Sequence, residues 1–144
     1  MTRVFVLNGV NLGALGTRRP ELYGTMTLDD IQRLLEKEFP DLDLEFRQTD
    51  SEGEMTAFLR EAAASDGLVI NAGAWTHYSY ALHDALKPLD VPKVEVHISN
   101  VHRREVWRRH SVISPAVDAV IAGMGVQGYV AAVRYVTERL HGPT

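Results

Sequence analysis

A glutamate and a histidine two residues apart are the first candidates for chemistry in this sequence. The stretch from Lys93 to Ile98 has β-branched residues at alternate positions and lies between a proline and Ser-Asn, which is typical of a strand. On a strand, Glu95 and His97 point to the same face. A carboxylate beside an imidazole orients the ring and raises its basicity, so the pair is a candidate for proton transfer.

Arginines follow this predicted strand at positions 103, 104, 108 and 109. Guanidinium groups beside an acid–base pair indicate chemistry on an anion. Two plainer interpretations stay open: a Glu-x-His pair is often structural, and a run of arginines often forms a solvated helical face. The net charge of −4 argues against general affinity for nucleic acid, although the arginines could still hold a small anion.

Composition excludes several mechanisms. The sequence has no cysteine, which excludes disulfides, thiolate nucleophiles and cysteine-ligated zinc. Only three lysines are present, Lys37, Lys87 and Lys93, so a Schiff-base mechanism has few candidates. A strand begins at Arg3 and no apolar run approaches a membrane span, which favours the cytoplasm.

The elements that position these residues alternate between strand and helix along a single domain, residues 1–144. The predicted strands are Arg3 to Leu7, Leu42 to Gln48, Gly67 to Asn71, Lys93 to Ile98 and Val117 to Ala122. Helices are expected from Thr27 to a stop at Pro40, after Ser51, from Tyr78 to Leu86 and from Tyr129 to Leu140, with a short helix in the arginine-rich segment.

This alternation predicts an α/β fold: a flavodoxin-like, doubly wound, five-stranded parallel sheet of order 2-1-3-4-5, with helices on both faces. In that order the carboxyl ends of the first, third and fourth strands are neighbours, and ligands bind there. The loops after these three strands hold the unusual polar residues, whereas the loops after the second and fifth strands are poorer in them.

The segment from Asn8 to Met26, after the first strand, is much longer than the usual strand-to-helix loop of about two to six residues. Such loops are often lids or binding loops, and the other interpretation is an ordinary surface loop. Tyr23 on this segment could act as a general base if guanidinium groups favour its phenolate; Arg18 on the same segment and Arg108 across the crevice are candidates. Alone, a loop tyrosine is usually a packing residue.

The third strand ends at Asn71, which could orient a hydroxyl, and His77 after it could donate to one. Asp84 lies two helical turns beyond His77 and is expected on the same helix face. The alternative for this turn is capping, with Thr76 or Ser79 as helix N-cap.

Two further patterns are set aside. Residues 123–128 match GxGxxG, yet no strand and no suitable acid follow, so we interpret them as a tight turn with close helix–sheet packing and not as a dinucleotide site. The histidines show no ligand spacing, and the arginines would repel a cation, so no metal is expected.

Taken together, these blocks resemble the type II 3-dehydroquinate dehydratases over nearly the whole chain. The similar blocks are NGVNLG from Asn8, RRPELYG from Arg18, NAGAWTHYSYALHDA from Asn71, EVHISN from Glu95 and the pair Arg104 and Arg108. Val10 stands where the family usually has proline, and Arg19 where it usually has glutamate. These departures could alter lid closure but remove no catalytic group.

The resemblance implies a cofactor-independent anti elimination of water from 3-dehydroquinate, in the shikimate pathway of aromatic amino-acid biosynthesis. It implies Tyr23 as base with Arg18 and Arg108, Asn11 acting on the enolate through a water, and His97 held by Glu95 as acid. The remaining implied contacts are Ile98 and Ser99 with the substrate carboxylate, Asn71, His77 and Arg108 with ring hydroxyls, Arg104 in support of the lid, and Asp84 in a neighbouring subunit's site. The family assembles as a dodecamer, a tetramer of trimers.

Two other functions stay open. One is a different lyase or isomerase that acts on a small cyclic acid in the same crevice. The other is a non-enzymatic, flavodoxin-like module that binds an anion or regulates a partner.

Overall fold

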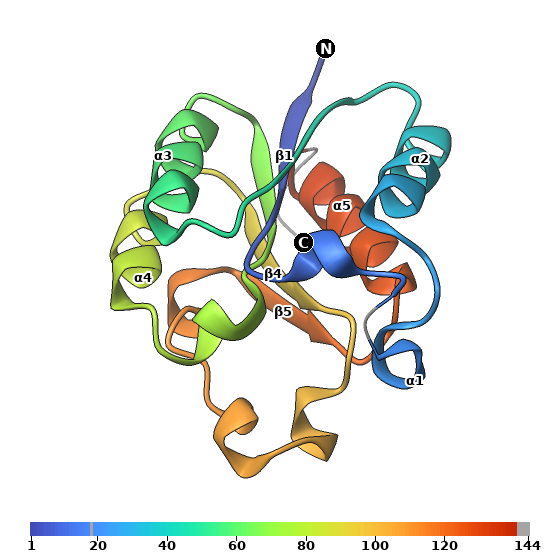
Figure 1. Ribbon diagram of the computed structural model, residues 1–144. Helices are drawn as coiled ribbons and strands as arrows, with labels where there is room; N and C mark the ends of the chain where they lie inside the picture. Colours follow the sequence, from blue (N-terminus) through green and yellow to red (C-terminus); the bar gives the residue numbers. More distant parts are fainter. Residues whose placement is uncertain (18, 141–144) are drawn as a thin grey trace.

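Five parallel strands form one sheet in the order β2-β1-β3-β4-β5 in the computed structural model, which describes residues 1–17 and 19–140 (Figure 1). The strands are β1 Arg3–Asn8, β2 Asp43–Gln48, β3 Gly67–Asn71, β4 Lys93–His97 and β5 Ala119–Ala122. The predicted fold class, strand order and parallel pairing are confirmed.

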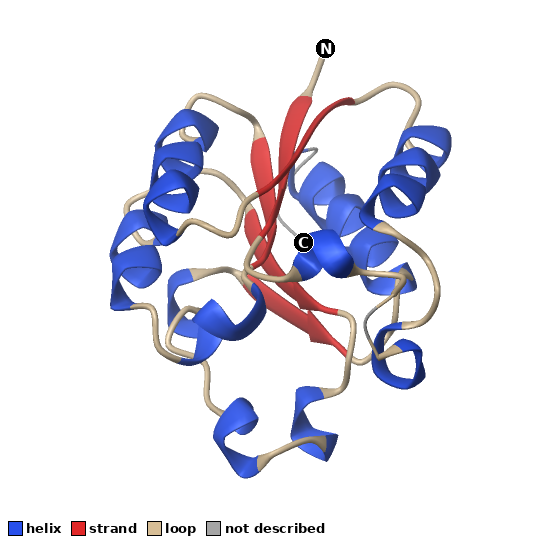
Figure 2. Cartoon of the chain, in the orientation of Figure 1, coloured by secondary structure: helices blue, strands red, loops and turns tan. Residues whose placement is uncertain are grey.

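Helices cover both faces of the sheet (Figures 1 and 2). Helices α2, Leu28–Glu38, and α5, Gln127–Leu140, pack together on one face, and α3, Glu52–Ala62, and α4, Tyr80–Leu86, on the other. The shorter helices are α1 Pro20–Tyr23 and the 3-10 helices η1 Leu12–Ala14, η2 Gly73–His77, η3 Val101–Arg103, η4 Val106–Arg109 and η5 Ser114–Ala116. In the described part of the chain, no helix has the length and apolar character needed to cross a membrane.

Side-chain caps fix the starts of the two predicted helices α2 and α3. The hydroxyl of Thr27 accepts from the Asp30 backbone N–H at 3.1 Å, and the Asp30 carboxylate accepts from the Thr27 N–H at 3.0 Å, which is a complete capping box. Ser51 accepts from the N–H of Glu54 at 3.1 Å. Both predicted helix starts are confirmed.

The structure corrects several predicted boundaries. The segment from Asn8 to Met26 is not structureless, because η1 and α1 lie within it. The helix predicted from Tyr78 begins at Tyr80, since η2 occupies the preceding turn, and Ser79 is its N-cap. The strand predicted from Val117 begins at Ala119, after η5. The arginine-rich segment forms the separate turns η3 and η4.

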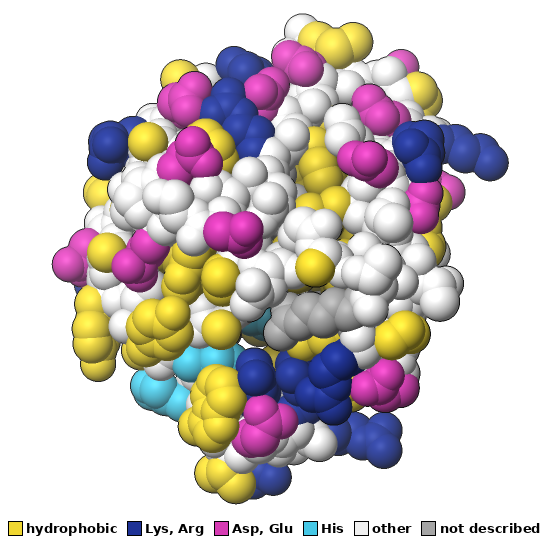
Figure 3. Space-filling model, in the orientation of Figure 1, with side chains coloured by type: hydrophobic (Ala, Val, Ile, Leu, Met, Phe, Trp, Pro, Cys, Tyr) yellow, Lys and Arg dark blue, Asp and Glu magenta, His cyan; other side chains and the backbone are white. Residues whose placement is uncertain are grey.

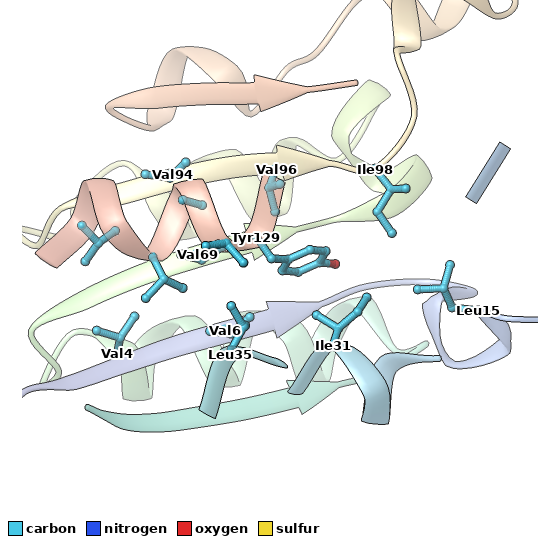
Figure 4. Close-up of a cluster of buried hydrophobic side chains, with 14 of the residues drawn as sticks. Val4, Val6, Leu15, Ile31, Leu35, Val69, Val94, Val96, Ile98 and Tyr129 are labelled. Atoms are coloured by element: carbon cyan, nitrogen blue, oxygen red, sulfur yellow. The ribbon is translucent and has the colours of Figure 1, made fainter. Parts of the chain in front are cut away.

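The core has two halves because successive side chains of a buried strand point to opposite faces. On β1, Val4 and Val6 join the cluster beneath α2 and α5, whereas Phe5 and Leu7 join the cluster beneath α3 and α4. Figure 4 shows the first cluster, in which Tyr129 of α5 lies among the aliphatic side chains of the strands. A parallel sheet buried on both faces is thereby filled on each side.

Register brings the ends of β1 and β3 side by side. Asn8 pairs with Asn71 in the sheet, and the backbone N–H of Gly9 donates to the Asn71 carbonyl at 2.8 Å.

The predicted tight turn at residues 123–128 is confirmed. Gly123 and Gly125 have φ of 88° and 61°, and a Cβ at Gly128 would lie 3.2 Å from Val96 Cγ2.

Gly67 offers a test of how tightly α5 packs on the sheet. A Cβ at Gly67 would lie 2.2 Å from Cγ1 of Val136, so Gly67→Ala should lower the free energy of unfolding by about 1–3 kcal/mol through overpacking. The matched control is Gly53→Ala, where the nearest atom is 3.9 Å away in the first turn of α3, and stability should stay level or rise by up to about 1 kcal/mol. Chemical denaturation of both variants gives the comparison, and equal losses would contradict the packing.

Candidate active site

A cavity of about 170 Å³ lies at the carboxyl end of the sheet, among the segments that follow β1, β3 and β4. Predicted site residues from all three segments lie on its wall: Asn11, Tyr23, Asn71, His77, His97, Ile98, Ser99, Arg104 and Arg108. On the face shown in Figure 3, histidine and arginine side chains gather in the lower part of the view, near the segment after β4 (compare Figure 1). The cavity therefore combines acid–base groups with positive charge.

Two predicted site residues among those described, Glu95 and Asp84, do not line this cavity. Glu95 lies behind His97, with no exposed surface. Asp84 is exposed on α4, whereas His77 belongs to η2, so the prediction that these two share a helix face is wrong. Arg18 falls outside the described residues. Lys93 begins β4, and its ammonium donates to backbone carbonyls at the end of α4, away from the cavity.

The buried pair of Glu95 and His97 is the chemical centre of the site. Nε2 of His97 is hydrogen-bonded to Oε2 of Glu95, and the His97 side chain is 10% exposed. A carboxylate oxygen accepts, so Nε2 carries a proton and Nδ1 is the ring nitrogen left for another partner. When Nδ1 is protonated as well, the ring is an imidazolium. It could then donate from Nδ1 to a group in the cavity, while the Glu95 carboxylate stabilises its positive charge.

Hydroxyl groups surround the Glu95 carboxylate on its remaining sides. Thr76 donates to Oε2 and Ser114 to Oε1, and the Ser111 hydroxyl lies 3.3 Å from Oε2. Sequence reasoning missed Ser111 and Ser114 and considered Thr76 only as a cap. No spacing motif signals them, because Thr76 reaches the carboxylate from η2, Ser111 from the chain between η4 and η5, and Ser114 from the start of η5.

These contacts decide the ionisation of Glu95. Burial alone raises the pKa of a carboxyl, but here the hydrogen bond and charge of His97, with the hydroxyls of Ser114 and Thr76, outweigh burial and hold the pKa of Glu95 below its ordinary value. Glu95 is therefore a carboxylate at neutral pH.

Tyr23 lies at the end of α1 and is 9% exposed. The guanidinium of Arg104 stacks over its ring, 5.4 Å from the centroid, and Nη1 of Arg104 donates to the Ser99 hydroxyl at 3.3 Å. Nε of Arg104 is buried and has no hydrogen-bond partner among the described residues. Arg104 thus connects the α1 segment to the end of β4.

Asn11 occupies a left-handed turn, with φ of 69°. Its backbone N–H donates to Oδ1 of Asp50 at 2.8 Å, and Gln48 donates to the same oxygen at 3.1 Å and to the Gly9 carbonyl at 3.2 Å. The segment after β2, expected to be poor in functional groups, therefore supports the site by fixing the turn that carries Asn11.

The ring of His77 is held by the carbonyl of His110, 2.8 Å from Nδ1. A carbonyl can only accept, so Nδ1 carries the proton. Burial, aided by the positive charges of His97 and Arg108, lowers the pKa of His77 against the opposing effect of this hydrogen bond. At neutral pH the ring is uncharged and Nε2 is an acceptor, so the predicted donation from His77 to a hydroxyl applies only to the protonated ring.

Arg108 is held in place on both sides. Its guanidinium lies 4.1 Å from the Trp107 ring centroid, and Nε donates to Glu105 at 2.7 Å. Trp107 also contacts the edge of the His77 ring, with centroids 5.3 Å apart. Arg108 therefore stands in the cavity wall with a fixed orientation.

Among residues 1–17 and 19–140, no group of three or more His, Cys, Asp or Glu side chains could hold a metal ion.

The Ser114 hydroxyl provides a test of the ionised Glu95. Because the folded-state pKa of Glu95 lies below its unfolded value of about 4.3, the carboxylate stabilises the fold above that pH, and this contribution is lost as pH falls through the folded pKa. Ser114→Ala should cost about 1.5–3 kcal/mol of unfolding free energy near pH 7 and less as Glu95 becomes protonated.

Ser79→Ala is the matched control, because it removes the N-cap hydroxyl of α4, whose hydrogen-bond partner is the backbone N–H of Leu82 and not an ionisable group. This substitution should lower the free energy of unfolding by about 1 kcal/mol at every pH. Denaturation of both variants between neutral and acidic pH distinguishes them. A loss for Ser114→Ala that does not depend on pH would contradict an ionised Glu95.

Comparison with known proteins agrees with the resemblance. The family model "Dehydroquinase class II" matches residues 2–137. A 3-dehydroquinate dehydratase of Kineococcus radiotolerans is 48% identical over 143 residues, covering 97% of this chain and 98% of the relative. A 3-dehydroquinate dehydratase of Mycobacterium tuberculosis is 48% identical over 140 residues, covering 95% of each.

Solved structures give the same result. The type II dehydroquinase of Propionibacterium acnes has a TM-score of 0.90 at 46% identity, covering 95% of this chain and 97% of that one. The type II dehydroquinase of Butyrivibrio crossotus has a TM-score of 0.92 at 37% identity, covering 94% and 97%. The family model, the identity to the relatives and the shared fold agree, and the chain belongs to the class II dehydroquinase family.

Proposed function

We propose that this protein catalyses the anti elimination of water from 3-dehydroquinate, giving 3-dehydroshikimate through an enolate and without a cofactor. The observation that carries the proposal is one cavity with a buried phenol, a carboxylate-held imidazole and two guanidinium groups on its wall. The curated relatives bear the name of this activity. A phenol and an imidazole in one wall supply the base and the acid that an elimination needs.

In the proposed first step, Tyr23 as the phenolate removes the proton α to the ketone, and the electrons of the C–H bond form an enolate. Arg18 and Arg108 are assigned to this step by the resemblance. Asn11 stabilises the enolate through a bound water, as a preorganised donor. The left-handed turn of Asn11 supports this role, because the hydrogen bond from its backbone N–H to Asp50 holds the backbone of this cavity-lining residue in place.

In the second step, the enolate re-forms the ketone and the β C–O bond breaks, giving the conjugated double bond. His97 donates a proton to the departing hydroxyl, which leaves as water. The hydrogen bond from Nε2 to Glu95 supports this assignment, because it leaves Nδ1 as the donor and stabilises the charged ring.

The substrate carboxylate is assigned to the backbone of Ile98 and Ser99 with the Ser99 hydroxyl. Arg104 donates to that hydroxyl and stacks on Tyr23, which supports its assignment to the lid. Ring hydroxyls are assigned to Asn71, His77 and Arg108, all on the cavity wall. This activity would serve aromatic amino-acid biosynthesis, and the cytoplasmic location expected from the sequence is part of the same proposal.

Removal of the Tyr23 hydroxyl tests the base. Tyr23→Phe keeps the ring beneath Arg104 and should lower kcat by about 10²–10⁴-fold, the usual contribution of a general base. The matched control is Tyr135→Phe on α5, outside the cavity, which should leave kcat unchanged. The assay follows the near-ultraviolet absorbance of the conjugated enone. Full activity of Tyr23→Phe would exclude it as the base, and an inactive wild-type protein would favour the anion-binding module.

Assembly completes the proposal: a dodecamer, in which Asp84 enters the site of a neighbouring subunit. Asp84 is exposed on α4 and away from its own cavity, which agrees with a role toward another copy. The edge strand β5 exposes 50% of Val120, and Trp107 is 54% exposed. Parallel sheets are normally covered on both faces, so the exposed Val120 on β5 suits a subunit contact, and the exposed Trp107 on η4 adds a second large apolar side chain at the surface.

Mixed assemblies test the placement of Asp84. Asp84→Ala and Tyr23→Phe should each be strongly impaired alone, because each removes one group from every site. When the two variants are dissociated, mixed and reassembled, some sites should contain neither substitution, and activity should return above that of either parent. Measurement of kcat before and after mixing, with mass by sedimentation, gives the result. An unimpaired Asp84→Ala, or a mixture without recovery at dodecameric mass, would contradict the placement.

A further inference from the structure

Behind the cavity, a buried chain of hydrogen bonds connects Tyr129 and Asn8, which the proposed reaction does not use, to Asn71 on the cavity wall. Tyr129 of α5 has no exposed surface, and its hydroxyl donates to Oδ1 of Asn8 at 2.7 Å. The same hydroxyl oxygen accepts from Nδ2 of Asn71 at 2.9 Å. Figure 4 shows the Tyr129 hydroxyl directed along the strands toward the end where Ile98 lies, which is the cavity end.

The direction of each hydrogen bond in this chain is fixed. Nδ2 of Asn8 donates to the Arg47 carbonyl at 3.1 Å, so the Asn8 amide presents its oxygen to Tyr129. Burial raises the pKa of the Tyr129 hydroxyl above its ordinary range, so the hydroxyl keeps its proton and has one to give. Once that proton is given to Asn8, the hydroxyl can only accept from Asn71.

The Asn71 amide is therefore held at both ends. Oδ1 accepts from the Gly73 backbone N–H at 3.1 Å, and one Nδ2 proton goes to Tyr129. The second Nδ2 proton is the one hydrogen-bond donor that this 3%-exposed side chain has left to offer on the cavity wall, because Oδ1, turned toward the Gly73 N–H, can only accept. Asn71 thus presents a donor. An amide free to turn over could present an oxygen instead.

We propose that Tyr129 is a positioning residue: with Asn8, it fixes the Asn71 amide so that a hydrogen-bond donor faces the substrate. This inference rests on the proposed assignment of Asn71 to a ring hydroxyl. Neutral His77 offers an acceptor on the same wall, so the two side chains together select a hydroxyl that accepts from one and donates to the other. A ligand that has only a hydrogen-bond acceptor at this position would satisfy Asn71 alone, and a ligand that has only a donor would satisfy His77 alone.

A purely packing role would not require the hydroxyl. Tyr129 is surrounded by aliphatic side chains of the core beneath α2 and α5, where phenylalanine would fill the same space. A buried hydroxyl is costly unless both of its hydrogen-bonding capacities are used, and here both are used by amides at the ends of β1 and β3.

A double-mutant cycle tests the inference with 3-dehydroquinate as the probe. Tyr129→Phe should raise KM by about three- to tenfold, the size of one neutral hydrogen bond, and change kcat by less than about twofold, because the affected hydroxyl does not react. In the Asn71→Ala background the same substitution should change KM by less than about twofold, since its target is absent. Tyr135→Phe, on the same helix, should leave KM unchanged.

If Tyr129→Phe does not fold, Asn8→Ala provides the same test with the ring in place. Without Asn8 the Tyr129 proton can turn toward Asn71, and KM should again rise in the wild-type background but not with Asn71→Ala. An unchanged KM in a folded Tyr129→Phe or Asn8→Ala variant, or equal KM changes in both backgrounds, would overturn the inference.

The outcomes separate this inference from the proposal on which it rests. A wild-type protein without dehydratase activity overturns the proposed function and this inference together. An active wild type with an unaffected Asn71→Ala variant overturns the role of Asn71, and with it the inference, but leaves the reaction standing. An impaired Asn71→Ala with an unaffected Tyr129→Phe overturns the positioning role alone.

Discussion

A carboxylate with no exposed surface is the constraint on which this site depends. A buried charge is costly unless it is paired and hydrogen-bonded. Glu95 meets that requirement through His97 and the hydroxyls of Thr76 and Ser114. The chain must therefore return from the arginine-rich turns to place Ser114 beside β4, and η2 must hold Thr76 on the other side. The turns after β3 and β4 thus supply the hydroxyl groups that the buried Glu95 carboxylate requires.

The parallel sheet brings the remaining parts together. Strands β1, β3 and β4 are neighbours, so the segments after their carboxyl ends share one cavity. Polar groups behind the cavity hold residues of its wall: Asp50 accepts from the backbone N–H of Asn11 and fixes its turn, and Tyr129 of α5 holds the side-chain amide of Asn71. These two parts of the cavity wall are preorganised because the hydrogen bonds are made within the protein before any ligand enters.

Much of this arrangement could be predicted from the sequence because it follows from periodicity. The alternation of strands and helices predicts the sheet order, and the two-residue period of a strand predicts that Glu95 and His97 meet. The caps at Thr27 and Ser51 were predictable because their partners lie within one helical turn. These are local rules, and the structure confirms them.

The parts that could not be predicted depend on contacts between distant segments. Ser114 reaches Glu95 from beyond the arginine-rich turns, and Tyr129 reaches Asn8 across almost the whole chain, so neither has a spacing signature. A helical tyrosine in an apolar stripe predicts only packing. The proton position on His77 depends on the carbonyl of His110, which no residue type reveals.

The charge of Glu95 is the central claim, and the most direct measurement is the ¹³C chemical shift of its side-chain carboxyl followed by NMR as a function of pH. The signal is assigned by its loss in Glu95→Gln. The account predicts a carboxylate shift at neutral pH that persists below about 4.3, where an exposed glutamate titrates. A carboxyl signal that is protonated at neutral pH, or that titrates above that value, would contradict it.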